Sequence, residues 1–265
     1  MKQEIFTGKH SSMAWQAMGR GKPIMMLHGW GSSSKSFHPL AKQLLNIRTS
    51  YLLDLPGFGE SPEPPAAWTV DDYADLVEEF MVSRFADQKV DLLVHSFGAR
   101  VAIKLLGREA VAKKIDKVVF TGAAGLKPKR KPDYYLKKYT AKILKFPFYI
   151  LPKSARERGF AKLRETSLWK KLGSSDYQKL SGVMRETFVK TVTEYLDAEI
   201  RKIDHEVLLL WGKNDTATPL DQGKRMKSGL KNSTLIEIDE AGHYAFLDRP
   251  QHFANIVKAY LEPAE

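Results

Sequence analysis

Val90-Asp-Leu-Leu-Val-His-Ser-Phe-Gly-Ala99 is the stretch of this 265-residue chain that decides its fold. The apolar run 90–94 predicts a strand that is buried on both faces of a sheet. The helical spacing of apolar residues over 99–106 predicts a helix that begins almost at once. Because so few residues connect the two elements, we expect Ser96 to stand on a sharp strand-to-helix bend with its hydroxyl exposed.

The residues around Ser96 are compatible with a nucleophile at this bend. Gly98 would let the helix pack closely beneath it, and the Phe97 N–H would point to where an oxyanion forms. The usual pattern is Gly-x-Ser-x-Gly, but Val94 occupies the position of the first glycine. An isolated Ser before a helix could also be an N-cap. Ser96 therefore has to be argued from its surroundings as well as from its motif.

Similar apolar runs recur on both sides of this stretch, with helical patterns between them. One such helix is expected to take Asp71 or Asp72 as its N-cap. Residues 2–18 predict an N-terminal hairpin. Alternating strands and helices predict an α/β fold with a mainly parallel sheet and right-handed crossovers. The expected central strands are 24–27, 51–53, 90–94, 118–120, 207–211 and 234–238.

The alternation is interrupted over residues 125–205. This segment has 20 Lys/Arg and 9 Asp/Glu, while the rest of the chain has 22 of each, so the net charge of +11 lies within it. It contains no pattern that predicts a strand convincingly, and we expect it to form several helices. We therefore expect one core domain, formed by residues 1–124 and 206–265, with an inserted helical cap at 125–205.

A serine hydroxyl needs a base, and the base needs a carboxylate that orients it. His243 follows the expected strand 234–238, and Asp215 follows the expected strand 207–211. The carboxyl ends of parallel strands meet at one edge of a sheet. We therefore expect Ser96, Asp215 and His243 to form a catalytic triad.

The other acids and histidines are weaker candidates. Asp54 reads as part of the architecture of its loop, and Asp239 and Asp248 lie too close to His243 in the chain. Two histidines, His28 and His95, are expected to make local hydrogen bonds beside the site. The rest are expected at the surface or in a loop: His10, His38, His205 and His252.

The turn His28-Gly-Trp-Gly31 follows the first central strand. Glycines there would let the backbone turn its N–H groups inward, and we assign the second oxyanion-hole donor to the main chain of Trp30. The alternative is an ordinary glycine-rich turn in which the Trp30 side chain packs.

Taken together, these motifs resemble the α/β-hydrolase superfamily over roughly residues 20–122 and 206–262. The resemblance implies an eight-stranded, mainly parallel sheet with a helical cap inserted after the sixth strand. It also implies that the cap decides the substrate. A Ser at the bend argues against relatives with an Asp there, the haloalkane dehalogenases and epoxide hydrolases. The motifs are His28-Gly-Trp-Gly31, Asp54-Leu-Pro-Gly-Phe-Gly-Glu-Ser61, His95-Ser-Phe-Gly98, Trp211-Gly-Lys-Asn-Asp215 and Ala241-Gly-His243.

The function expected from these residues is cleavage of an ester or thioester of a small or lipid-like acyl substrate. Ser96 would attack the carbonyl, His243 would take its proton, and Asp215 would stabilise the imidazolium. Two alternatives stay open: hydrolysis of a carbon–carbon bond by the same triad, and a ligand-binding or signalling protein that turns over slowly.

No cofactor or metal is expected. The chain has no cysteine, no phosphate-binding loop and no His/Glu cluster at metal-ligand spacing. No nucleic-acid module is recognised. The N-terminus lacks an apolar signal region, and no apolar run approaches the roughly 20 residues that span a bilayer, so we expect a soluble, cytoplasmic protein.

The basic cap contains one amphipathic pattern, over residues 132–146. It can be interpreted as a lid that faces lipid, as a rim that attracts anionic substrates, or as an ordinary cap helix with an apolar side toward the cleft. From the sequence we favour the ordinary helix, because helical period carries no functional information. The apolar stripe is Leu136, Tyr139, Ile143 and Phe146, and the lysines beside it are Lys138, Lys142 and Lys145.

Overall fold

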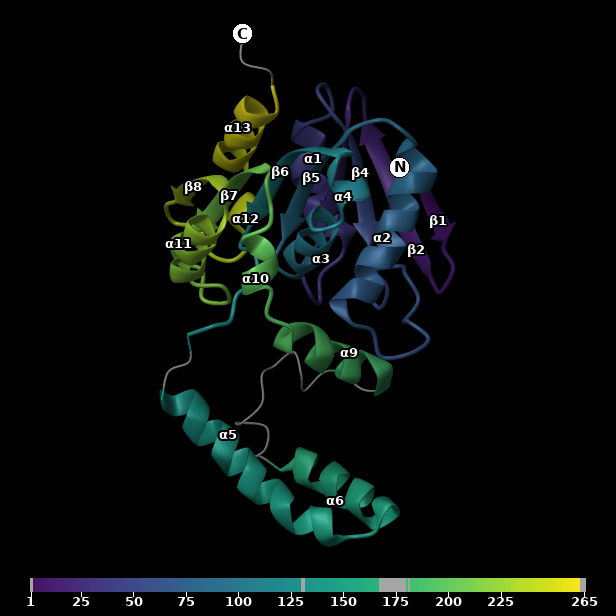
Figure 1. Ribbon diagram of the computed structural model, residues 1–265, viewed down its shortest axis with the longest axis vertical. Helices are drawn as coiled ribbons and strands as arrows, with labels where there is room; N and C mark the ends of the chain where they lie inside the picture. Colours follow the sequence, from purple (N-terminus) through teal and green to yellow (C-terminus); the bar gives the residue numbers. More distant parts are fainter. Residues whose placement is uncertain (1, 130–131, 167–179, 181, 263–265) are drawn as a thin grey trace. The chain divides into compact units, whose positions relative to one another are not determined.

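A computed structural model of the chain describes residues 2–129, 132–166, 180 and 182–262 (Figure 1). The chain divides into two compact units. The larger unit comprises 1–127 and 186–265, and the smaller comprises 128–185. Each unit is described by itself below.

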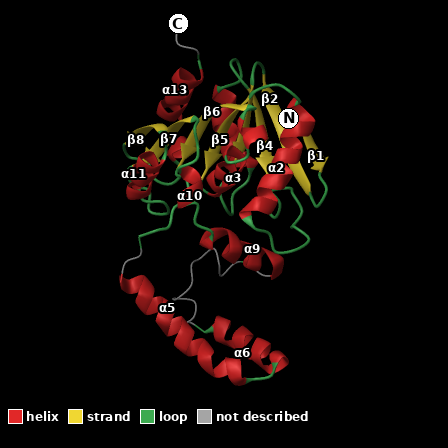
Figure 2. Ribbon diagram, in the orientation of Figure 1, coloured by secondary structure: helices red, strands yellow, loops and turns green. Residues whose placement is uncertain are grey.

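The larger unit is built on an eight-stranded sheet that lies between helices (Figure 2). The strand order is β1-β2-β4-β3-β5-β6-β7-β8. β1 and β2 form the expected N-terminal hairpin, β2 runs antiparallel to β4, and the remaining neighbours are parallel. The strands are β1 Gln3–Thr7, β2 Ser12–Gly19, β3 Pro23–Leu27, β4 Thr49–Asp54, β5 Val90–His95, β6 Ile115–Thr121, β7 Glu206–Gly212 and β8 Asn232–Ile238. The α/β-hydrolase architecture expected from the sequence is confirmed.

Helices cover both faces of this sheet, which is why its central strands can be apolar throughout. Every residue of β3 and β5 is buried. On one face, α1, α12 and α13 pack over an apolar cluster that includes Ile24, Leu93 and Leu210. On the other face, α2 packs against α3 and α11 packs on β7 and β8. The helices of this unit are α1 His38–Gln43, α2 Val70–Phe85, α3 Phe97–Leu106, α4 Glu109–Ala112, α10 Asp197–Ile200, α11 Leu220–Gly229, α12 Ala245–Asp248 and α13 Pro250–Leu261, with the 3-10 helix η1 Ser34–Phe37.

The prediction that Asp71 or Asp72 caps α2 is wrong, because Thr69 is the N-cap. The Thr69 hydroxyl accepts a hydrogen bond from the backbone N–H of Asp72, and the Asp72 carboxylate accepts one from the N–H of Thr69. This capping box satisfies two donors at once, so the helix begins earlier than its first acidic residues suggest.

The smaller unit contains the helices α5 (Pro132–Lys145) and α6 (Lys153–Glu165), joined by the 3-10 helix η2 (Phe146–Ile150). It is shorter than the cap expected at 125–205. The helix α9 (Gly182–Thr193) crosses the boundary, and its residues from Glu186 onward belong to the larger unit. There the buried Thr187 hydroxyl accepts from the Trp68 N–H at 3.0 Å, and Arg100 donates to the carbonyl of Glu194. These bonds between distant segments could not be read from the chain's local pattern.

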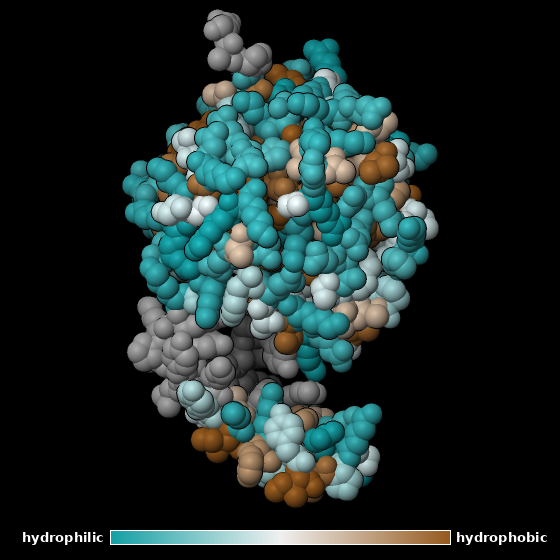
Figure 3. All heavy atoms as spheres, viewed as in Figure 1, coloured by the Kyte–Doolittle hydropathy of each residue, from teal (hydrophilic) through white to brown (hydrophobic). Residues whose placement is uncertain are grey.

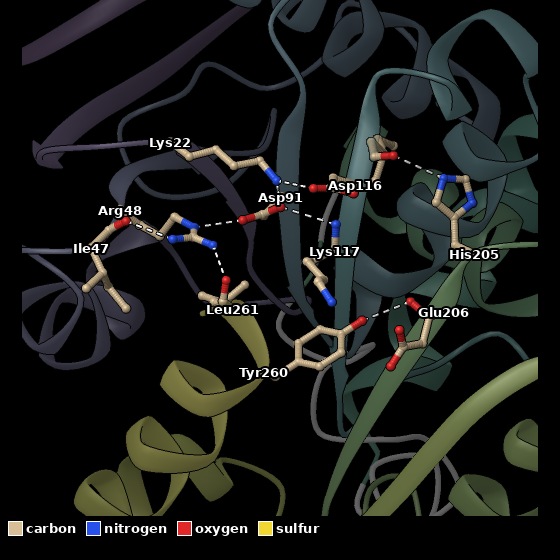
Figure 4. Close-up of polar contacts among 11 residues, drawn as sticks. Lys22, Ile47, Arg48, Asp91, Asp116, Lys117, His205, Glu206, Tyr260 and Leu261 are labelled. Atoms are coloured by element: carbon tan, nitrogen blue, oxygen red, sulfur yellow. Dashed lines mark hydrogen bonds and ion pairs between the residues drawn. The ribbon is translucent and has the colours of Figure 1, made fainter. Parts of the chain in front are cut away.

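A network of charges ties the amino ends of the central strands together (Figure 4). The Asp91 carboxylate, fully buried on β5, binds the Lys22 ammonium at 2.6 Å and the Arg48 guanidinium at 2.7 Å. Arg48 also donates to the carbonyl of Leu261 at the end of α13. Lys22 makes a second ion pair with Asp116 of β6. We call Lys22, Arg48, Asp91 and Asp116 the amino-edge network.

No helix in the part of the chain that the structure describes is long and apolar enough to cross a membrane.

Candidate active site

Ser96 lies between β5 and α3 with an unusual backbone conformation. Its φ is 50° and its ψ is −109°, a conformation that a residue with a Cβ adopts only at a cost of about 1–3 kcal/mol. Two residues later, a Cβ on Gly98 would lie 2.3 Å from the carbonyl oxygen of Leu27. Only glycine allows α3 to sit this close to β3, which produces the sharp bend. Within the described part of the chain, the Ser96 hydroxyl has no hydrogen-bond partner.

His243 and Asp215 lie at the carboxyl ends of β8 and β7 and face each other. His243 Nδ1 is 2.8 Å from Asp215 Oδ2. Because a carboxylate can only accept, Nδ1 carries the proton of this hydrogen bond, and in the neutral form of the imidazole Nε2 is the nitrogen with the lone pair. The other carboxylate oxygen of Asp215 accepts from the N–H groups of Ala217 and Thr218, at 2.9 Å and 2.8 Å. Asp215 is therefore fixed from both sides.

The electrostatics of the pair follow from these contacts. Burial raises the pKa of Asp215, but the hydrogen bond and charge of His243 and the two hydrogen bonds from Thr218 outweigh it, so this pKa lies below its ordinary value. Thr218 Oγ1 lies 2.8 Å from Asp215 Oδ2, 3.3 Å from His243 Nδ1 and 2.9 Å from the carbonyl oxygen of Gly122. An ionised Asp215 is the form that stabilises a protonated His243.

Gly122 brings the end of β6 to the same place. Its φ is +49°, and a Cβ on it would lie 3.1 Å from His243 Nδ1 and 3.2 Å from Asp215 Oδ2. One residue earlier, the carbonyl oxygen of Thr121 accepts from the Ser96 N–H at 3.2 Å. Four strand ends therefore meet around the His243–Asp215 pair. Neither Gly122 nor Thr218 was singled out from the sequence, although a glycine directly after a buried strand and a Thr three residues after Asp215 were visible signals.

His95 connects the Ser96 bend to the His243 loop. Its Nε2 donates to the carbonyl of His243 at 2.9 Å, and the two rings are 4.6 Å apart. Burial, with the nearby charge of His243, lowers the pKa of His95 to about 3, so the ring is neutral. Its Nδ1 is buried and has no hydrogen-bond partner among the described residues. The structure forms no hydrogen bond between the Ser96 hydroxyl and His243, which is common when no substrate is bound.

The turn after β3 packs directly against Ser96. A Cβ on Gly29 would lie 3.0 Å from the Cβ of Ser96, and Gly31 has a φ of +70° that favours glycine. In the described part of the chain, the N–H groups of Trp30 and Phe97 donate to no acceptor. Two backbone donors beside the Ser96 bend are thus available to an oxygen atom.

His28 fixes the base of this turn, which confirms the local hydrogen bonds expected for it. Its Nδ1 donates to the carbonyl of Gly29 at 2.8 Å, and its Nε2 accepts from the Leu55 N–H at 3.0 Å. Burial lowers the pKa of His28, in keeping with a neutral ring that both donates and accepts. Asp54 holds the adjoining loop by accepting from the N–H groups of Ser34 and Glu60. Its expected architectural role is confirmed.

The Trp30 side chain packs in an aromatic cluster beside the turn. Its ring centre lies 4.9 Å from that of Phe58, 5.2 Å from Phe97 and 5.0 Å from Phe188. Phe188 comes from α9, from the part of that helix that belongs to the larger unit. The cluster gives the turn an apolar wall. The sequence placed Phe58 in the motif 54–61 but linked neither it nor Phe188 to Trp30, because only the fold brings these rings together.

The arrangement can carry out nucleophilic chemistry on a carbonyl. It combines a hydroxyl with no partner among the described residues, an imidazole whose distal nitrogen can accept a proton, a carboxylate that orients the imidazole, and two backbone N–H donors. Within the residues that the structure describes, no group of three or more His, Asp or Glu side chains could hold a metal ion.

Comparison with known proteins agrees with the fold described above. A family described as "alpha/beta hydrolase fold" matches residues 22–250. The chain is 26% identical to "AB hydrolase superfamily protein YisY" of Bacillus subtilis, over 98% of this chain and 99% of that protein. It is 24% identical to "2-hydroxy-6-oxo-6-(2'-aminophenyl)hexa-2,4-dienoic acid hydrolase" of Metapseudomonas resinovorans, over 92% and 85% of the two chains. Among solved structures, an esterase from Exiguobacterium antarcticum superimposes with a TM-score of 0.72 at 22% identity, over 96% of each chain.

Proposed function

The chain belongs to the α/β-hydrolase fold family, and on that premise we propose that it is a serine hydrolase that cleaves an ester or thioester through Ser96. The observation that carries this proposal is the conformation of Ser96. A serine with a φ of 50° at a strand-to-helix bend is costly to maintain, and its hydroxyl stands on the edge where Asp215 and His243 form their hydrogen bond. Strain at such a position is typical of a functional residue.

The reaction follows from the donors and acceptors of the site. His243 Nε2 accepts the proton of the Ser96 hydroxyl as Oγ attacks the carbonyl carbon. The N–H groups of Trp30 and Phe97 donate to the oxyanion that forms. His243 then gives its proton to the departing alcohol or thiol, and an acyl group stays on Ser96. A water molecule, deprotonated by His243, releases the acid and restores the hydroxyl.

The aromatic cluster favours an apolar acyl group. Trp30 and Phe97 supply both the proposed oxyanion donors and two of its rings. An acyl chain whose carbonyl binds these donors would thus be held close to apolar surface. We therefore propose small or lipid-like acyl substrates.

Hydrolysis of a carbon–carbon bond is the second candidate. The acid named for the Metapseudomonas relative contains a ketone and no ester, so its hydrolysis does not need an ester bond. The same hydroxyl, base and oxyanion donors could act on such a ketone. A ligand-binding protein with slow turnover is the third, and it would share this geometry without fast catalysis.

The test uses a series of nitrophenyl esters together with a fluorophosphonate probe that labels activated serines. We expect wild type to turn over the esters and to be labelled. Ser96→Ala should not be labelled and should lose at least about three powers of ten in kcat. Ser228→Ala, which changes an exposed serine on α11, is the matched control and should behave as wild type.

Each other outcome has a definite meaning. Labelling of Ser96→Ala at the wild-type rate would show that the nucleophile is another residue. Fast labelling of wild type without ester turnover would instead favour carbon–carbon hydrolysis or a slow-turnover protein. Absence of both labelling and turnover would contradict a serine hydrolase.

A further inference from the structure

The smaller unit, residues 128–185, holds more of the exposed large apolar side chains of the described residues than its length predicts. Of the twelve large apolar side chains that are exposed in the described part of the chain, six belong to this unit. Apolar side chains are visible at its surface in Figure 3. Exposed apolar groups of this size, gathered in one place, mark an interaction surface more often than chance. The six are Tyr139, Ile143, Phe146, Tyr149, Ile150 and Leu151.

Four of these side chains follow a helical spacing, and we call them the apolar ridge: Tyr139, Ile143, Phe146 and Ile150. Their exposed fractions are 57%, 71%, 67% and 78%. The first two lie on α5, and the others lie on η2, which continues directly from it. Spacings of four and three residues place Tyr139, Ile143 and Phe146 on one side of the helical stretch. Leu136 and Lys138, also expected in this pattern, have side chains outside the described residues.

The same unit carries all of the chain's excess positive charge. Its sequence holds 16 Lys/Arg and 4 Asp/Glu, whereas the rest of the chain holds 26 and 27. Lys142, Lys153 and Lys162 are exposed, and no ion pair with a described carboxylate neutralises them. The unit therefore combines an apolar ridge with a strongly positive field.

We propose that the smaller unit docks on the surface of an anionic lipid bilayer. Apolar and aromatic side chains of the ridge would enter the boundary between headgroups and acyl chains, which Tyr side chains favour because they are apolar with a polar tip. Lysines beside them would keep their ammonium groups among lipid phosphates. This binding goes beyond the proposed catalysis and does not depend on it.

Other occupants match only half of this chemistry. A nucleic-acid duplex would neutralise the charge but would leave the ridge in water, since it keeps its base faces stacked inside and presents a charged backbone. The rest of this chain, considered as a partner for the smaller unit, has an almost balanced charge and so offers no negative field to complement the positive one. An anionic bilayer offers both an apolar interior for the ridge and negatively charged headgroups for the lysines.

The first experiment measures binding of the full chain to sedimenting vesicles. Vesicles of phosphatidylcholine alone are compared with vesicles that also contain phosphatidylglycerol, at low and at physiological salt. We expect at least about tenfold tighter binding to the anionic vesicles, weakened by salt. Equal binding to both vesicle types, or none to either, would overturn the proposal. Ser96→Ala is measured in parallel and should bind as wild type, so that failure of the catalytic proposal can be told apart from failure of this one.

The second experiment separates the ridge from the charge. The double variant Ile143→Ser/Phe146→Ser keeps every charge and removes two ridge side chains. We expect it to bind anionic vesicles at least about tenfold more weakly. The control Val82→Ser/Leu247→Ser removes two exposed apolar side chains from the larger unit and should bind as wild type. Far-ultraviolet circular dichroism checks that each variant keeps its helices.

The third experiment removes charge and keeps the ridge. The variant Lys142→Gln/Lys153→Gln/Lys162→Gln should lose most of the salt-sensitive part of the binding. Its control changes three exposed lysines of the larger unit, Lys9, Lys42 and Lys227, to Gln and should bind nearly as wild type. If the lysine substitutions weaken binding and the ridge substitutions do not, the surface binds through charge alone, as a nucleic-acid site would. That outcome would show that the lipid proposal is wrong.

Discussion

The two edges of the central sheet carry polar clusters that are arranged in opposite ways. At the amino edge, the buried Asp91 carboxylate accepts from Lys22, Arg48 and the N–H of Lys117 (Figure 4). At the carboxyl edge, the Ser96 hydroxyl has no partner among the described residues, and the His95 Nδ1 is buried without one. The buried charge of the amino edge is thus fully paired, whereas at the carboxyl edge two polar groups lack partners among the described residues, beside the paired Asp215.

This difference indicates which edge holds the fold and which is available for chemistry. Buried charges that are fully paired connect segments far apart in the chain, such as Arg48 and the end of α13. Unpaired groups and a strained backbone cost stability, and proteins keep them mainly where a ligand or reaction uses them. The contrast predicts that changes at the carboxyl edge alter activity more than stability, and that changes at the amino edge do the reverse.

The largest expected effect is at the carboxyl edge, with Asp215→Asn. The amide can donate to His243 Nδ1, which would move the imidazole proton to Nε2 and prevent it from accepting the Ser96 proton. We expect kcat to fall by about 10⁴ with an almost unchanged melting temperature, measured with nitrophenyl esters. The control Asp239→Asn, at an exposed carboxylate paired with Lys213, should leave kcat unchanged. A fall of less than tenfold for Asp215→Asn would mean that Asp215 does not orient the base.

The second effect is at the amino edge, with Asp91→Ala. This change leaves the largely buried Arg48 guanidinium without its carboxylate, and we expect the free energy of unfolding to fall by about 3–5 kcal/mol. Denaturant unfolding measures this loss, while kcat per folded molecule should stay the same. Asp116→Asn is the matched control, since Asp116 is 44% exposed and its pair with Lys22 should contribute under about 1 kcal/mol. Equal losses for both variants would remove the special role given to the buried Asp91.

A third effect concerns pH and His95. The pKa of His95 is about 3 in the folded protein, against its ordinary value of 6.5, which we take for the unfolded chain. Between these values the unfolded chain binds a proton that the folded protein does not, so stability is lost as pH falls through this window. By pH 5 the loss should reach about 2 kcal/mol relative to neutral pH. Denaturant unfolding of wild type and His95→Gln at several pH values tests this, because the variant should lack this part of the acid sensitivity. Parallel pH curves for the two proteins would contradict it.

The smallest expected effect is a gain in stability from Ser96→Gly. Glycine adopts a φ of 50° without the strain of a Cβ, so the free energy of unfolding should rise by about 1 kcal/mol. Ser96→Ala is the comparison, because it removes the same hydroxyl and keeps the Cβ. Comparing the two variants by calorimetry isolates the free-energy cost of the strained backbone at residue 96. If glycine gives no gain over alanine, the bend is not strained and the contrast between the edges is weaker than described.

Much of the fold could be predicted from local patterns. The run 90–94 and its counterparts became the central strands because a fully buried strand must be apolar along its whole length. Ser96, Asp215 and His243 were chosen because each follows such a strand, and parallel strands bring their carboxyl ends to one edge. The triad itself stays a prediction until activity is measured.

Two expectations drawn from the local sequence differ from the structure, each for a physical reason. Asp71 and Asp72 looked like N-caps, but a reciprocal pair of hydrogen bonds between Thr69 and Asp72 is more favourable and lengthens the helix. Residues 186–205 looked like cap, but Thr187 and Glu194 bind partners more than ninety residues earlier in the chain. Contacts with segments so far away produce no periodic pattern in the sequence.

The sequence by itself therefore determined the strands, the fold family and the residues that follow each strand, since these depend on periodicity and on the order of short motifs. Only the tertiary structure decided what surrounds them. Gly122 beside the His243–Asp215 pair, the Thr218 hydroxyl between its atoms, and Phe188 against Trp30 are contacts made through space. They depend on distances of a few ångströms between segments that the chain order keeps far apart.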